Sequence, residues 1–279
     1  MTTTPSTPRR RLLLLDFDGT VCLGDDPVLA YARRVDAILA ARGEEGGVEA
    51  AVAHALAVED LLAADIAFDE TGFPRGVDQE PVERGAEPHR APSAHPVSWP
   101  VQDGYQLVQL LARQRGLSDA DAGQAFLGGR EDLLARGLGT TDVHAPAGLA
   151  ELLDEVRAEA GVVLATNAPA AAFGPWLETL GLTEAFDAVI TDSRKPFGMP
   201  EVLRRAGELI GGEEPVPAQE ILSVGDIWRN DHEHLAALGG TTLLIDRFAT
   251  GLGEPDHRVQ DFADAAPIIR SWARARARR

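Results

Sequence analysis

Carboxylates occur in this sequence where two apolar segments end. Asp16 and Asp18 follow a run of four leucines, and Asp226 and Asp231 follow a second apolar segment. Buried like charges repel one another, so a cluster of these side chains requires a compensating cation. Asp16, Asp18 and Asp226 together would form an oxygen-rich site of the kind that Mg²⁺ prefers, with Asp231 close behind. Such a metal would also shield an anionic substrate from the carboxylates.

Three other polar residues follow further apolar segments. Thr166 and Asn167 come directly after one of them, and Lys195 comes soon after the next. Lys195 is also the only lysine of the chain, since the other 25 of its 26 basic residues are arginines. These segments therefore supply a hydroxyl and an ammonium group beside the carboxylates.

The segments that precede these residues are typical of buried parallel strands, which lose their polar alternation because helices cover both faces. The five predicted strands are Leu12–Leu15, Val162–Ala165, Ala188–Ile190, Ile221–Val224 and Leu243–Ile245. Amphipathic helical patterns lie between the later strands, which predicts an α/β fold with a doubly wound parallel sheet. Ligands of such sheets bind at the carboxyl ends of the strands, so the residues above would meet at one edge.

The chain also divides into regions of different pattern. Residues 11–22 and 140–279 form the predicted α/β core, and residues 1–10, rich in Thr and Pro, are expected to be a loose terminus. Residues 23–139 show helical patterns without strand signals, which predicts an inserted helical domain; Ser118, with Asp121 three residues on, marks one helix start. Within the insert, residues 69–100 are rich in Pro, Gly and charge, which is typical either of a functional lid or of disorder. Gly128-Gly129-Arg130 is expected at a helix junction.

The ordered motifs resemble those of a known superfamily. Asp16-Phe17-Asp18-Gly19-Thr20 is similar to the first motif of the haloacid dehalogenase (HAD) superfamily. Thr166, Lys195 and Gly225-Asp226-…-Asp231 are similar to its second, third and fourth motifs, in that order. The resemblance covers about residues 11–20 and 139–246 and implies a Rossmann-like HAD core. The helical insert corresponds to the superfamily's first cap position in placement, although not in sequence.

The resemblance implies a role for each matched residue. Asp16 would be the nucleophile that forms an aspartyl-phosphate, and Asp18 the general acid and then the base that activates water. Thr166 would hold a phosphoryl oxygen, and Lys195 would neutralise the nucleophile and the developing phosphoryl charge. The implied substrate-binding residues are Gly19, Thr20, Thr166 and Asn167. The implied Mg²⁺ ligands are Asp16, Asp18 through its backbone carbonyl, Asp226 and, directly or through water, Asp231.

These roles predict a Mg²⁺-dependent phosphatase that hydrolyses a small phosphorylated metabolite, a phosphomonoester, under a helical cap. Members of the superfamily that cleave carbon–halogen bonds lack an aspartate at the position of Asp18, which favours phosphoryl chemistry. A phosphotransferase or phosphomutase would use the same motifs, and the reaction products would separate the two. A non-catalytic binding protein on a HAD scaffold is a third interpretation, which turnover of any phosphoester would exclude.

The composition of the chain limits the classes of binding partner and the cellular compartment that we expect. The net charge of −18, from 26 basic and 44 acidic residues, argues against a nucleic-acid binder. The basic C-terminal residues are interpreted as the end of a last helix, where cations suit the helix dipole. Cys22 is the only cysteine, which fits a reducing cytoplasm, and no apolar run is long enough to predict a membrane span.

Two further features have a simple structural interpretation. His232 and His234 flank Glu233, but residues two positions apart point to different faces of a helix. A solvated helix is therefore expected there rather than a zinc site. Trp228, close to Asp226, is expected to pack in the core rather than to stack on a substrate.

Overall fold

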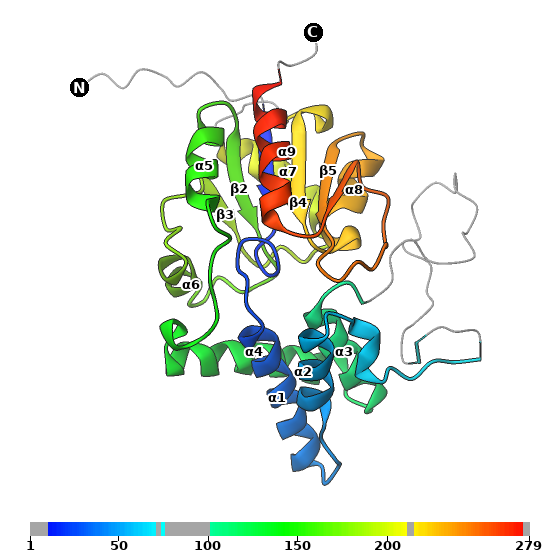
Figure 1. Ribbon diagram of the computed structural model, residues 1–279. Helices are drawn as coiled ribbons and strands as arrows, with labels where there is room; N and C mark the ends of the chain where they lie inside the picture. Colours follow the sequence, from blue (N-terminus) through cyan, green and yellow to red (C-terminus); the bar gives the residue numbers. More distant parts are fainter. Residues whose placement is uncertain (1–10, 71–73, 76–100, 211–214, 276–279) are drawn as a thin grey trace. The chain divides into compact units, whose positions relative to one another are not determined.

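Figure 1 shows the computed structural model of the chain, which describes residues 11–70, 74–75, 101–210 and 215–275. The chain divides into two compact units. Unit 1 comprises Met1–Gly24 and Asp142–Arg279, and unit 2 comprises Asp25–Thr141. The predicted loose terminus and most of the 69–100 loop lie outside the described residues.

Unit 1 is built around a six-stranded parallel sheet with the strand order β3-β2-β1-β4-β5-β6. The strands are β1 (Leu12–Leu15), β2 (Gly161–Ala165), β3 (Ala188–Ile190), β4 (Ile221–Gly225), β5 (Thr241–Ile245) and β6 (His257–Val259). This confirms the predicted α/β fold. The edge strand β6 was not predicted, because its three residues, His-Arg-Val, carry no apolar run.

Helices cover both faces of this sheet, which explains why its central strands are apolar throughout. In Figure 1, α5 (Leu149–Arg157) and α9 (Phe262–Arg274) lie side by side in front of the sheet, and α7 (Met199–Leu209) lies behind it. Leu12 and Leu14 of β1 pack in one core cluster with Val202 of α7 and Leu235. The alternate leucines of β1 point to the other face and are also fully buried. The unit is completed by α6 (Gly174–Thr179), α8 (Glu233–Ala237), a 3₁₀ turn (Ala218–Glu220) and a π-helical turn (Trp228–His232).

The regular elements of unit 2, in its described part, are helical. They are α1 (Asp26–Ala41), α2 (Val48–Ala57), α3 (Gly104–Gln114), α4 (Asp119–Arg136) and two 3₁₀ turns (Leu61–Ala64 and Leu138–Thr140). Ser118 caps α4 as predicted: its hydroxyl accepts from the Asp121 amide, and the Asp121 carboxylate accepts from the Ser118 amide. The expectation of a helix junction at Gly128-Gly129-Arg130 was wrong, because these residues lie inside α4.

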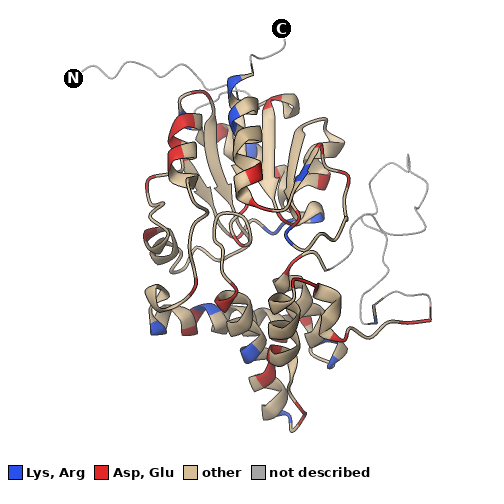
Figure 2. Cartoon of the chain, in the orientation of Figure 1, with Lys and Arg blue, Asp and Glu red and all other residues tan. Residues whose placement is uncertain are grey.

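Charged residues on the surface of unit 1 include the predicted basic end of the last helix. Acidic residues are spread over both units (Figure 2). On α9, Arg270 and Arg274 both pair with Glu155 of α5, at 2.9 and 3.6 Å, so these cations help to hold two helices together. In the described part of the chain, no helix is both long and apolar enough to cross a membrane.

Candidate active site

The turn after β1 carries Asp16 and Asp18, and the residue between them is anchored in the core. Phe17 is fully buried, with its ring 4.7 Å from that of Phe173 and 6.3 Å from that of Trp176. The Asp16 amide donates to the carbonyl of Val224 on β4 at 2.9 Å. Asp16 therefore lies at the carboxyl end of β1 beside β4, and the Asp18 carboxylate is close enough to contribute to raising the pKa of Asp16.

Gly19 allows this turn to lie directly against the side chain of Asp226, the residue that follows β4. Its φ of +80° is in the left-handed region, and a Cβ at this position would lie 2.0 Å from Asp226 Oδ2. Any larger residue would have to push the two acidic segments apart. The glycine of the first motif therefore has a packing reason at this site.

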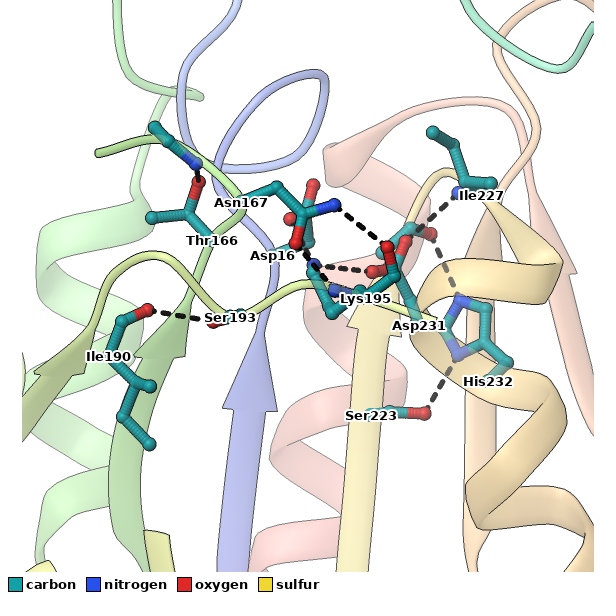
Figure 3. Close-up of polar contacts among 12 residues, drawn as sticks. Asp16, Thr166, Asn167, Ile190, Ser193, Lys195, Ser223, Ile227, Asp231 and His232 are labelled. Carbon is teal, nitrogen blue, oxygen red and sulfur yellow. Dashed lines mark hydrogen bonds and ion pairs between the residues drawn. The ribbon is translucent and has the colours of Figure 1, made fainter. Parts of the chain in front are cut away.

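Lys195 lies between two carboxylates at the centre of the site. Its Nζ is 2.5 Å from Asp16 Oδ1 and 2.6 Å from Asp231 Oδ1, and its side chain is only 4% exposed (Figure 3). The apolar side chains of Leu14 and Met199 line the space beside it. One ammonium group thus pairs with two aspartates at a position that is largely shielded from solvent.

This environment shifts the acid–base equilibria of the pair. Burial, with a smaller contribution from the nearby Asp231 carboxylate, raises the pKa of Asp16 to about 7, against the lowering effect of the Lys195 ammonium. Burial alone would lower the pKa of Lys195, but the two carboxylates raise it above its usual range. The cluster is therefore short of positive charge even with its lysine ionised.

Asp231 is held in place by the turn after β4. Its Oδ2 accepts from the Ile227 amide at 3.1 Å, and its own amide donates to the Ile227 carbonyl at 3.0 Å. It also packs on Gly225, where a Cβ would lie 2.4 Å from Asp231 Oδ2. This part of the chain is a π-helical turn, a geometry often found at functional sites.

Three carboxylates have the composition and spacing of a divalent-cation site. One oxygen from each of Asp16, Asp226 and Asp231 lies within 4.8 Å of the others. All three ligand atoms are hard oxygens, and Asp226 and Asp231 are buried, so the donor set fits Mg²⁺. The Asp18 side chain, which is partly exposed, is not in this group; its expected contribution was through the backbone carbonyl.

Asn167 has a contact that the sequence did not reveal. Its Oδ1 accepts from the Lys195 amide at 2.6 Å, and its Nδ2 donates to the Lys195 carbonyl at 3.0 Å. This two-point contact fixes the backbone of the lysine. The Asn167 side chain thus holds the backbone of Lys195 through both its oxygen and its nitrogen.

The other residues expected to bind substrate lie deeper. Thr166 is buried, and its Oγ1 accepts from the Ala168 amide at 3.0 Å. Thr20 is fully buried, and its amide donates to the Phe17 carbonyl within the turn at 3.3 Å. The Thr20 side chain is therefore not exposed at the surface.

His232 differs from the expectation of a solvated helix. Its ring is fully buried and contacts Ser223 Oγ and the Gly225 carbonyl, whereas His234 is partly exposed. Burial lowers the pKa of His232, which favours the neutral imidazole. Helical periodicity did not signal the burial of His232, because the π-helical turn breaks that periodicity.

The expected packing role of Trp228 is confirmed, because its side chain is buried.

Comparison with known proteins shows the family of this chain. The family model of haloacid dehalogenase-like hydrolases matches residues 11–239, and the chain therefore belongs to this family. No match was found among curated proteins.

Solved structures share the fold at low sequence identity. A haloacid dehalogenase-like family hydrolase from Xanthomonas campestris is 19% identical, with a TM-score of 0.50 and coverage of 94% of this chain and 91% of the other. A predicted phosphoglycolate phosphatase from Haemophilus somnus is 15% identical, with a TM-score of 0.53 and coverage of 92% and 97%. A haloacid dehalogenase-like hydrolase from Streptococcus pneumoniae is 13% identical, with a TM-score of 0.50 and coverage of 92% and 97%.

Proposed function

We propose that this hydrolase is a Mg²⁺-dependent phosphatase that cleaves a small phosphomonoester through an aspartyl-phosphate on Asp16. The observation that carries the proposal is the position of Lys195 Nζ, which lies 2.5 Å from Asp16 Oδ1 and 2.6 Å from Asp231 Oδ1. An ammonium in this position holds the Asp16 carboxylate in place and leaves positive charge beside the incoming phosphoryl group.

In the first half-reaction, a carboxylate oxygen of Asp16 attacks phosphorus and the bond from phosphorus to the ester oxygen breaks. Asp18, two residues further along the same turn, donates a proton to the departing oxygen. In the second half-reaction, Asp18 takes a proton from water, whose oxygen attacks phosphorus. Inorganic phosphate leaves and the Asp16 carboxylate is restored.

The carboxylates of Asp16, Asp226 and Asp231 and the carbonyl of Asp18 would hold the metal. Bound Mg²⁺ would offset the charge repulsion between these carboxylates and the phosphoryl group. Both oxygens of Asp231 already accept hydrogen bonds, from Lys195 and from Ile227, which favours contact between Asp231 and the metal through water. Asp226 is buried at the end of β4 against Gly19, which supports direct contact.

Unit 2 is proposed to be the cap that selects the substrate, since specificity in a shared fold resides in the parts grafted onto it. It interrupts unit 1 shortly after the turn that carries Asp16 and Asp18. Turnover of a panel of phosphorylated metabolites would identify the substrate class.

Phosphate release from an aryl phosphate tests the proposed chemistry. Asp16→Asn removes the nucleophile without changing the size of the side chain, and we expect it to abolish release. EDTA should abolish release by the parent protein, and added Mg²⁺ should restore it. Full activity of the variant, or of the EDTA-treated parent, would refute the proposal. Transfer of the phosphoryl group to an added alcohol instead of water would indicate a phosphotransferase.

A further inference from the structure

His232 is a buried polar side chain to which the proposed reaction gives no role. Its Nδ1 lies 2.7 Å from Ser223 Oγ, and its Nε2 lies 3.3 Å from the carbonyl oxygen of Gly225 (Figure 3). A carbonyl only accepts hydrogen bonds, so Nε2 carries the proton and Nδ1 accepts from the Ser223 hydroxyl. Both ring nitrogens are therefore used within the protein, in one defined tautomer.

These two contacts enclose the acidic segment after β4. Gly225 immediately precedes Asp226, and His232 immediately follows Asp231. The imidazole therefore ties the chain just before one carboxylate to the chain just after the other. Ser223 lies two residues further back on β4, so the ring also fixes the turn to the rigid part of the sheet.

We propose that His232, with Ser223, is a positioning residue that sets the separation of Asp226 and Asp231 and thereby the affinity of the site for a divalent cation. This inference rests on the proposed function, because the cation belongs to that proposal. A side chain that only filled this space would need no nitrogens, and burying them carries a desolvation cost that the two hydrogen bonds offset.

Calorimetric titration of the full chain with Mg²⁺ tests the inference. His232→Phe keeps an aromatic ring but removes both hydrogen bonds, and we expect it to weaken Mg²⁺ binding about 10-fold, as for other residues that support metal ligands. His232→Gln can keep a donor near the position of Nε2, and we expect a smaller loss of Mg²⁺ affinity than in His232→Phe. A His232→Phe protein that is folded and binds Mg²⁺ as tightly as the parent would overturn the inference.

A matched control separates positioning from general loss of stability. Asp261 caps α9 in the same unit, with its Oδ1 accepting from the Asp264 amide at 3.0 Å. Asp261→Ala should lower stability without weakening Mg²⁺ binding. Weakened binding in this control as well would contradict a specific role for His232.

Amide hydrogen exchange in the metal-free protein gives a second readout that does not depend on the proposed function. The amides of Ile227 and Asp231 are hydrogen-bonded within the turn, and both should exchange faster in His232→Phe but not in Asp261→Ala. Unchanged exchange would overturn the positioning role even if phosphatase activity were established. If the parent bound no Mg²⁺, the proposed function would fail, and the exchange rates would still decide the role of His232. If His232→Phe did not fold, His232→Gln would carry both measurements.

Discussion

Two aspartates of unit 1 occupy equivalent positions in the sheet but have opposite surroundings. Asp16 follows β1 and Asp246 follows β5, and each is paired with one basic side chain at 2.5 Å, Lys195 for Asp16 and Arg258 for Asp246. Asp246 also accepts from the amide and hydroxyl of Thr250, at 2.9 and 2.8 Å, and from the Gly251 amide at 2.9 Å. The lysine at Asp16 is instead shared with a second carboxylate.

The pKa values of the two aspartates shift in opposite directions for this reason. Burial alone would raise the pKa of Asp246, but hydrogen bonds from Gly251, Thr250 and Arg258 lower it below its usual value. The pKa of Asp16 is raised to about 7. A carboxylate that receives several hydrogen bonds, as Asp246 does, stabilises the loop that supplies the donors. The carboxylates of Asp16 and Asp231 instead share one lysine, as expected of the cation site that we propose. Both residues are aspartates that directly follow a strand of the same sheet. The number of hydrogen-bond donors around each carboxylate therefore distinguishes the structural aspartate, Asp246, from the proposed catalytic one, Asp16.

Among the changes that compare the two aspartates, we expect the largest effect from exchanging lysine and arginine beside them. Lys195→Arg should lower kcat/KM about 100-fold, because a planar guanidinium cannot replace a compact ammonium between two carboxylates. Arg258→Lys, the matched reverse change beside Asp246, should leave kcat/KM within about twofold of the parent. Steady-state assays of phosphate release from an aryl phosphate measure both. Near-parent turnover by Lys195→Arg would show that the site needs only a positive charge.

Removal of the well-satisfied carboxylate should affect stability instead. Asp246→Ala leaves the amides of Thr250 and Gly251 without their acceptor, and we expect it to lower the free energy of unfolding by about 2 kcal/mol. Urea denaturation measures this loss, and the folded variant should keep its activity. Loss of activity at unchanged stability would mean that the division between the two aspartates is wrong.

The contact that orients Lys195 should have a smaller effect than the lysine itself. Asn167→Ala removes both hydrogen bonds to the backbone of Lys195 and should lower kcat about 10-fold, through misplacement of the ammonium. Asn167→Asp keeps the acceptor of the Lys195 amide but replaces the donor by a second acceptor. If the alanine variant retained full kcat, the lysine would need no help from Asn167.

The smallest effect is a dependence of stability on pH. The pKa of Asp246 is lower in the folded than in the unfolded chain, so its contribution is present above about pH 4 and is lost as the pH falls through the folded pKa. The parent should therefore lose more stability than Asp246→Asn between about pH 5 and pH 3. Denaturation curves at several pH values would show this, and equal losses would indicate that Asp246 has no net shift.

The sequence predicted the features that depend on continuous patterns. Runs such as Leu12–Leu15 identified five of the six strands, because buried parallel strands are apolar throughout. The edge strand β6 lacks such a run and was missed. The spacing of motifs also placed the acidic residues at one edge of the sheet.

Contacts that depend on three-dimensional geometry were not predictable from the sequence. The side chain of Asn167 bonds Lys195, 28 residues away, and no local pattern signals such a contact. His232 is buried by the π-helical turn, which helical periodicity does not describe. The hydrogen-bond donors around Asp246 likewise come from a loop, and the pattern of apolar residues in a loop does not predict its conformation.

The identity of the phosphorylated residue shows directly whether Asp16 is the nucleophile. Rapid acid quenching during turnover of an aryl phosphate, followed by borohydride reduction and peptide mass mapping, would convert an aspartyl-phosphate to homoserine at its position in the chain. We expect homoserine at residue 16 in the parent and none in Asp16→Asn. Phosphate release by the parent without any conversion of Asp16, or conversion of a different aspartate, would contradict it.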